Sequence, residues 1–123
     1  MKIAISADTN NGLESIVAHH FGRCPYFILV DVDGKEIKTV QAVTNPFVNG
    51  HQPGQVPAFI QSQKADVMLS GGMGGRAIQF FEGAGIKAAT GANGSVRQSL
   101  ESYFGGALTD ASPCDESVAH GHG

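Results

Sequence analysis

The sequence has 123 residues, of which 41% are apolar and 15% are charged, and its formal net charge is −3. This length corresponds to one domain with its own hydrophobic core, and the composition excludes a disordered chain. No apolar run reaches the roughly 20 residues that a membrane-spanning helix requires. The basic residues are scattered singly, so there is no basic patch to attract nucleic acid or an anionic membrane. The sequence begins with a strand pattern rather than a secretion signal, and we therefore expect a cytoplasmic protein.

Cysteine and glycine are the two informative residue types in the composition. Cys24 and Cys114 lie far apart and form no C-x-x-C pair, which in a cytosolic chain predicts free thiols or metal ligands rather than a disulfide. The 17 glycines are about twice the average share, and they gather at the ends of apolar segments. This placement predicts tight turns at which backbone approaches backbone or a ligand.

The first half of the sequence predicts a strand followed by a β-hairpin. Asp33-Gly34 is a strong hairpin signal because it separates an apolar run from a second segment of strand length. Asn45-Pro46 then ends the pattern and opens a loop. In chain order, we expect a buried strand at residues 2–7, a polar loop at 8–25, a strand at 26–30 and an antiparallel strand at 36–44.

The second half alternates helix and strand. Ser95 and Gln98 form a capping box before an apolar stripe at helical spacing, and Gly105-Gly106 ends that helix. The expected elements are a helix around 56–60, a strand at 67–69, a helix around 77–81, a strand at 86–89 and a helix from 96 to 104. We therefore predict an α/β fold, parallel in its second half, with helices on both sheet faces. Residues 1–108 form the single domain, and residues 109–123 are expected to be a mobile tail.

A glycine-rich turn follows the expected strand at 67–69 and opens a helix. Open α/β sheets bind ligands at such places, where free N–H groups and the positive helix end face an anion. The turn lacks the Lys-Ser/Thr of a phosphate-binding loop and the later acid of a dinucleotide fingerprint. Two interpretations stay open: a tight turn that needs glycine for positive φ and close helix–strand packing, and an anion-binding turn. The candidate residues are Gly71, Gly72, Met73, Gly74 and Gly75.

Three potential metal ligands lie close together in the expected loop at 8–25. His19, His20 and Cys24 carry the imidazole and thiol groups that soft metals bind, and Arg23 can offset an anionic ligand. The alternative is a surface loop with solvated histidines. His51 lies in a further loop and is a weaker candidate ligand. The sequence contains no motif of a hydrolase or metalloprotease, so we expect a protein that is not an enzyme.

Several of these segments together resemble the nitrogenase accessory factor family, the dinitrogenase iron–molybdenum cofactor biosynthesis proteins. The resemblance extends from Met1 to about Leu108. It is carried by His20-Phe21-Gly22-Arg23 with Tyr26-Phe27, by Asn45-Pro46, by Gly71-Gly72-Met73-Gly74, by Gly85-Ile86-Lys87 and by Tyr103-Phe104-Gly105-Gly106.

The resemblance implies a three-layer α/β/α fold of the ribonuclease H-like type, with five strands of which the second is antiparallel to the rest. It implies a non-catalytic carrier of an iron–molybdenum cofactor, its precursor or a related molybdenum/iron (copper) sulfide cluster, with cofactor biosynthesis or delivery proteins as partners. His20 corresponds to the family's suspected cluster ligand. Cys24 departs from the family pattern and is either a thiolate ligand or a buried substitute.

Two other functions stay open from the sequence. One is a regulatory or interaction module that has the fold without a cluster, and the other is a small anion or nucleotide binder that uses only the glycine turn. A cluster site requires the loop after the first strand and the turn after the fourth strand to meet. They meet if these strands are parallel neighbours, because both segments then emerge at the same sheet edge.

Overall fold

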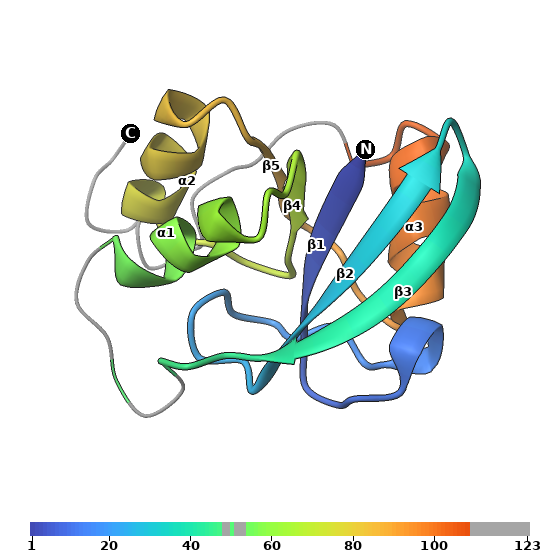
Figure 1. Ribbon diagram of the computed structural model, residues 1–123, viewed down its shortest axis with the longest axis horizontal. Helices are drawn as coiled ribbons and strands as arrows, with labels where there is room; N and C mark the ends of the chain where they lie inside the picture. Colours follow the sequence, from blue (N-terminus) through green and yellow to red (C-terminus); the bar gives the residue numbers. More distant parts are fainter. Residues whose placement is uncertain (48–49, 51–53, 109–123) are drawn as a thin grey trace.

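The computed structural model describes residues 1–47, 50 and 54–108. A five-stranded mixed sheet forms its centre, with the strand order β3-β2-β1-β4-β5 (Figure 1). Strand β2 is antiparallel to β1 and β3, whereas β1, β4 and β5 are parallel, so the predicted arrangement with only the second strand reversed is confirmed. The strands are β1 (Lys2–Ala7), β2 (Tyr26–Asp33), β3 (Glu36–Thr44), β4 (Val67–Leu69) and β5 (Lys87–Ala89).

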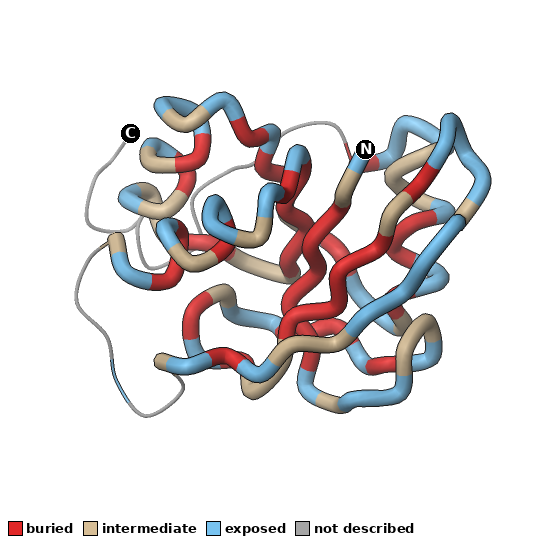
Figure 2. The backbone as a smooth tube through the Cα atoms, in the orientation of Figure 1, coloured by how far each residue is buried: buried red, intermediate tan, exposed pale blue. Residues whose placement is uncertain are grey.

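The predicted hairpin is present, but its turn lies one residue later than the Asp33-Gly34 signal indicates. Asp33 pairs with Glu36, so Gly34 and Lys35 form the turn, and Gly34 adopts a φ of +63°. The register then shifts near Asp31, which bends the edge strand β3. Most of β3 is exposed, in contrast to the buried central strands (Figure 2).

In the described part of the chain, α-helices cover both faces of the sheet (Figure 1). Helices α1 (Gln55–Ser62) and α2 (Gly75–Gly83) pack on one face and α3 (Val96–Phe104) packs on the other. The predicted capping box of α3 is confirmed, because Ser95 accepts from the Gln98 N–H and Gln98 accepts from the Ser95 N–H. A short 3-10 helix, η1 (Gly12–Glu14), lies in the segment that was predicted to be irregular.

The sheet separates two apolar cores. In β1, Ile3 and Ile5 face the core under α3, and Ala4 faces the core under α1 and α2. This alternation follows from the period of two in a strand, and it places a central strand between two helical layers.

The topology positions the site. Because β1 and β4 are parallel neighbours, the loop after β1 and the glycine turn after β4 emerge at the same edge. No helix in the described part of the chain is long and apolar enough to cross a bilayer. The expected tail at 109–123 lies outside the described residues.

Candidate functional site

The histidine loop and the glycine turn lie side by side. The Phe21 N–H donates to the Gly72 carbonyl oxygen at 2.9 Å, and the Gly71 N–H donates to the Ala18 carbonyl oxygen at 3.1 Å. His20 and Gly72 form an isolated parallel bridge. The two segments that the sequence places at one sheet edge are therefore joined through their backbones.

Gly71 is required by this close approach. A Cβ atom at Gly71 would lie 2.8 Å from the Cα of His19 and 2.9 Å from the Ala18 carbonyl oxygen. None of the glycines at 71, 72, 74 and 75 has a positive φ, so the expectation of positive φ in this turn is wrong. Since the Gly71 N–H already has an acceptor, it is not a donor for a ligand.

The N-terminus of α2 follows the turn and lacks a cap. Its N-cap residue, Gly74, has no side-chain hydrogen bond to offer, and the first turn carries no acidic residue. The first helical hydrogen bond runs from the Ile78 N–H to the Gly74 carbonyl oxygen at 3.2 Å. Among the described residues, no acceptor faces the N–H groups of Gly74, Gly75 and Arg76. This helix end is therefore positive and open to an anion.

The N-terminus of α1 also begins at a glycine. Gly54 is its N-cap residue, with a φ of +87° and no side chain to form a cap, and no acid lies in the first turn of this described helix. Helices α1 and α2 lie next to each other on the same face of the sheet (Figure 1). Their beginnings border one pocket of about 330 Å³, so two positive helix ends act on the same space. Its lining residues are Phe21, Gly54, Val56, Pro57, Gly74, Arg76 and Ala77.

One arginine lines this pocket, and two histidines directly precede one of its lining residues. Arg76 lines it, is exposed, and forms no ion pair within the described residues. His19 and His20 are exposed and directly precede Phe21, whose side chain lines the pocket. Arg23 is also exposed. The arrangement suits an anionic ligand that carries a metal with a free coordination position.

Cys24 is buried, in contrast to the histidines. Its side chain is 2% exposed and packs in the apolar core under α1 and α2. Burial, with a smaller contribution from the Asp8 carboxylate, raises the pKa of the Cys24 thiol to about 11. A metal ligand must be the thiolate, so a protonated thiol in the core favours the buried substitute over the ligand.

The other candidate residues contribute less. Met73 is 1% exposed and its side chain lies in the same core, which leaves only its backbone for a ligand. His51 lies outside the described residues. Within residues 1–47, 50 and 54–108, no group of three or more His, Cys, Asp or Glu side chains is arranged to hold a metal ion.

Sequence reasoning missed the pocket itself. Phe21 belongs to the motif His20-Phe21-Gly22-Arg23, but the motif does not indicate that Phe21 lines a pocket. Arg76 had one signal: it is a cation in the first turn of a helix, where acids are usually preferred, and it directly follows the glycines. No sequence pattern indicates that Gly54 borders the pocket, because its proximity to α2 arises only from the packing of α1 against α2.

Comparisons with known proteins agree with this fold. The family model described as dinitrogenase iron-molybdenum cofactor matches residues 1–106. The crystal structure of PH0822 superposes with a TM-score of 0.78 at 38% identity, covering 89% of this chain and 96% of that one. The apo form of the orange protein from Desulfovibrio gigas superposes with a TM-score of 0.80 at 26% identity, covering 91% and 93%. An uncharacterized protein of Methanocaldococcus jannaschii is 28% identical over 110 residues, which are 88% of this chain and 89% of that protein.

Proposed function

The chain belongs to the dinitrogenase iron–molybdenum cofactor family, and from this premise we propose that it is a non-catalytic, cytoplasmic carrier. Its cargo is an iron–molybdenum cofactor, a precursor of that cofactor or a related molybdenum–sulfide cluster. Proteins of cofactor biosynthesis or delivery would supply and accept this cargo.

One observation carries the proposal: two helix N-termini that begin at a glycine, together with Arg76, border one pocket, and the exposed His20 precedes the lining residue Phe21. Metal–sulfide clusters are anions, so they are attracted to positive helix ends and to an arginine without a partner carboxylate. An imidazole is a suitable ligand for their metals. The site therefore offers both an electrostatic well and a directional bond.

Each group has a distinct role in this proposal. His20 provides the metal ligand, with His19 as its neighbour. Arg23 and Arg76 offset the negative charge, and the N–H groups at Gly74 and Gly75 donate to sulfide. Phe21 forms an apolar wall, and its ring lies 5.4 Å from the ring of Phe81 and 5.9 Å from that of Phe27. Exclusion of water on this side strengthens the electrostatic attraction.

The site favours a preassembled cluster over a bare ion. A bare transition-metal ion needs about four protein ligands in a structural site. The described residues hold no group of three, and the only cysteine among them is buried and protonated. A cluster that brings its own sulfide ligands needs one imidazole and several weak donors, which this edge of the sheet provides.

Anaerobic titration with isolated iron–molybdenum cofactor, followed by absorption, tests the proposal. His20→Ala is expected to lose most of the affinity, because it removes the directional ligand. Met73→Leu should retain it, because its side chain lies in the core. Arg76→Ala should bind about tenfold more weakly, since one charge-assisted contact is worth 1.5–3 kcal/mol, or about tenfold and more in affinity. Equal affinity of wild type and His20→Ala would reject the site.

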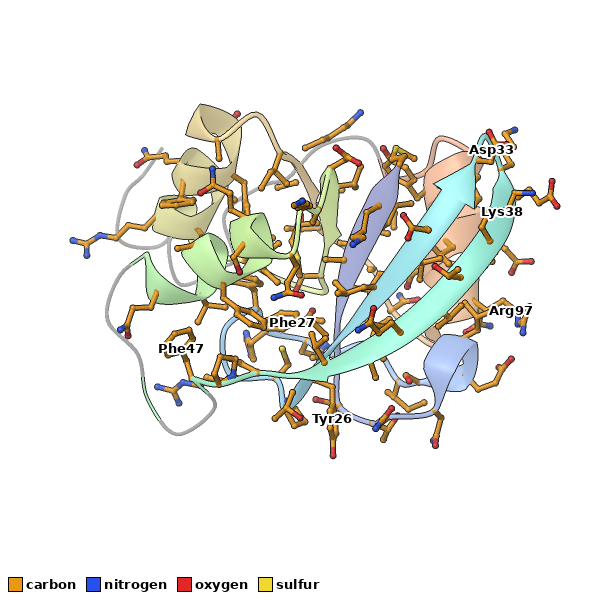
Figure 3. All side chains as sticks on the ribbon, in the orientation of Figure 1. Tyr26, Phe27, Asp33, Lys38, Phe47 and Arg97 are labelled. Carbon is orange, nitrogen blue, oxygen red and sulfur yellow. The ribbon has the colours of Figure 1, made fainter. Side chains whose placement is uncertain are left out.

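A matched arginine controls for net charge. Arg97 is exposed like Arg76, but it pairs with Glu14 at 2.9 Å beside α3, on the opposite face of the sheet. Figure 3 shows Arg97 near η1, away from α1 and α2. Arg97→Ala should leave cofactor affinity unchanged. An equal loss from both arginine variants would show that only the overall charge of the protein matters.

The pocket also supports a second candidate, a binder of small inorganic anions that makes no metal–ligand bond. This candidate is supported because both positive helix N-termini attract an anion whether or not His20 binds it. Titration with molybdate separates the two functions. An anion binder would bind molybdate equally in wild type and His20→Ala, and would lose that binding in Arg76→Ala.

A further inference from the structure

Asn45 makes a set of buried hydrogen bonds directly behind the histidine loop. It follows β3, is 1% exposed, and has every polar group of its side chain in use. Its Nδ2 donates to the carbonyl oxygens of Gly22 at 3.1 Å and Cys24 at 2.9 Å. Its Oδ1 accepts from the Phe47 N–H at 2.9 Å.

The two acceptors are the carbonyl groups on either side of Arg23. The backbone of Arg23 is therefore held from both directions by one buried amide. Gly22 reaches this position with a φ of +99°, a conformation that L side chains rarely adopt. The Arg23 side chain is exposed and makes no ion pair within the described residues, so its position depends on its backbone.

The hydrogen bond that Asn45 Oδ1 accepts from Phe47 links Asn45 to side chains that pack against α1. The Phe47 ring lies 6.5 Å from the ring of Phe59, which lies in α1 and is 6.1 Å from the ring of Phe27. Figure 3 shows Phe47 and Phe27 on the side of the sheet that α1 covers. Asn45 thus connects the loop of Arg23 with the layer whose helix N-terminus borders the pocket.

We propose that Asn45 is a positioning residue that holds the backbone of Arg23 at the place from which its side chain meets the anionic cargo. The inference rests on the proposed function. Asparagine suits this role because it supplies two donated hydrogen bonds and one accepted one. Aspartate has the same shape and can accept from Phe47, but it has no donors and would set a carboxylate against two carbonyl oxygens.

The positioning role is tested first without cargo, by ¹⁵N relaxation of the amides of residues 22–24. Asn45→Ala and Asn45→Asp should both lower the order parameters of this segment from the range of rigid backbone toward that of flexible loops. Ser99→Ala is the matched control, since Ser99 is also 1% exposed and donates one partly buried hydrogen bond, to the Asn93 carbonyl oxygen, on the opposite face. Unchanged order at 22–24 in a folded Asn45→Asp protein would overturn the inference.

A double-mutant cycle then separates positioning of Arg23 from a general structural effect. The probe is tetrathiomolybdate, an anionic molybdenum sulfide, titrated anaerobically at a temperature at which every variant is folded. Asn45→Ala and Arg23→Ala should each bind about tenfold more weakly, and the double variant no more weakly than either single one. Ser99→Ala should bind like wild type. Additive losses, of about a hundredfold in the double variant, would overturn the inference.

The two experiments distinguish failure of the inference from failure of the proposed function. If the wild type binds neither tetrathiomolybdate nor the isolated cofactor, the proposed function is rejected, and the role of Asn45 toward cargo is rejected with it. If the wild type binds and Asn45→Ala binds equally well, the proposed function stands and the inference is rejected.

Discussion

Gly71→Ala should destabilise the protein and separate the histidine loop from the glycine turn. The new Cβ would lie 2.8 Å from the His19 Cα and 2.9 Å from the carbonyl oxygens of Ala18 and His19. All three are backbone atoms, so no rotamer change relieves the contact, and the loop must move by about 0.6 Å to reach an ordinary distance of 3.4 Å. Overpacking of this kind costs about 1–3 kcal/mol.

The same displacement weakens the two hydrogen bonds that join the segments. These bonds, from Gly71 to Ala18 at 3.1 Å and from Phe21 to Gly72 at 2.9 Å, contribute about 1 kcal/mol each. The total loss is therefore expected to be about 2–4 kcal/mol, which lowers the melting temperature of a domain of this size by roughly 10 °C or more.

Urea and thermal unfolding of Gly71→Ala, with Gly75→Ala as the matched control, measure this effect. A Cβ at Gly75 would meet nothing within 4 Å, and Gly75 begins α2 without a positive φ. Alanine there should stabilise the protein by about 0.5 kcal/mol, because it restricts the unfolded chain. A loss of stability in Gly71→Ala together with a gain in Gly75→Ala would support the close approach of the glycine turn to the histidine loop. A Gly71→Ala protein as stable as wild type would refute it.

Two further predictions concern buried polar groups. Burial raises the pKa of Cys24 from 9.0 to about 11, so the unfolded chain loses this proton first and the free energy of unfolding falls as pH rises between these values. Urea unfolding measured across this pH range should show the free energy of unfolding of the wild type falling by at most about 1.4 kcal/mol per pH unit. Cys24→Ala should lack this fall, and the same pH dependence in both proteins would contradict the prediction. In the wild type, the buried Ser6 hydroxyl donates to Ser70 Oγ at 2.9 Å. Ser70→Ala removes this acceptor and should lower the free energy of unfolding by about 1–3 kcal/mol, as measured by thermal unfolding. Ser62→Ala, at an exposed site, should cost less than about 0.5 kcal/mol, and equal losses would refute the difference.

The elements with a clear apolar period were predictable from the sequence. β4 lies at Val67–Leu69 as expected, because an apolar run this short, between two helical patterns, suits a buried strand better than a helix. β2 extends to Asp33, beyond the apolar run, since Asp31 and Asp33 alternate with the buried Val32. The 3-10 helix η1 has no period, and it is held by local bonds such as that from the Asn11 N–H to Ser15 Oγ.

The candidate site was predictable only where topology brings segments together. The approach of His20 to Gly72 follows from the parallel pairing of β1 with β4. The burial of Cys24 could not be predicted in this way, because a single cysteine in a polar segment has no periodic pattern that shows whether its side chain faces the core or the solvent. The pocket depends on how α1 and α2 pack against each other, which no local pattern encodes.

The hydrogen bonds around the histidine loop also determine when the site can exist during synthesis. The loop begins to emerge from the ribosome early, yet its backbone partners include three residues made much later: Gly71, Gly72 and, through the Val17 N–H, Gly94. Chains emerge from the N-terminus first, so the β2–β3 hairpin can pair with β1 long before these glycines are made. A nascent chain that stops before Gly71 contains Asn45, which holds the end of the loop, but lacks all three of these glycines. The edge at which the histidine loop meets the glycine turn is therefore completed only when most of the chain has been synthesised.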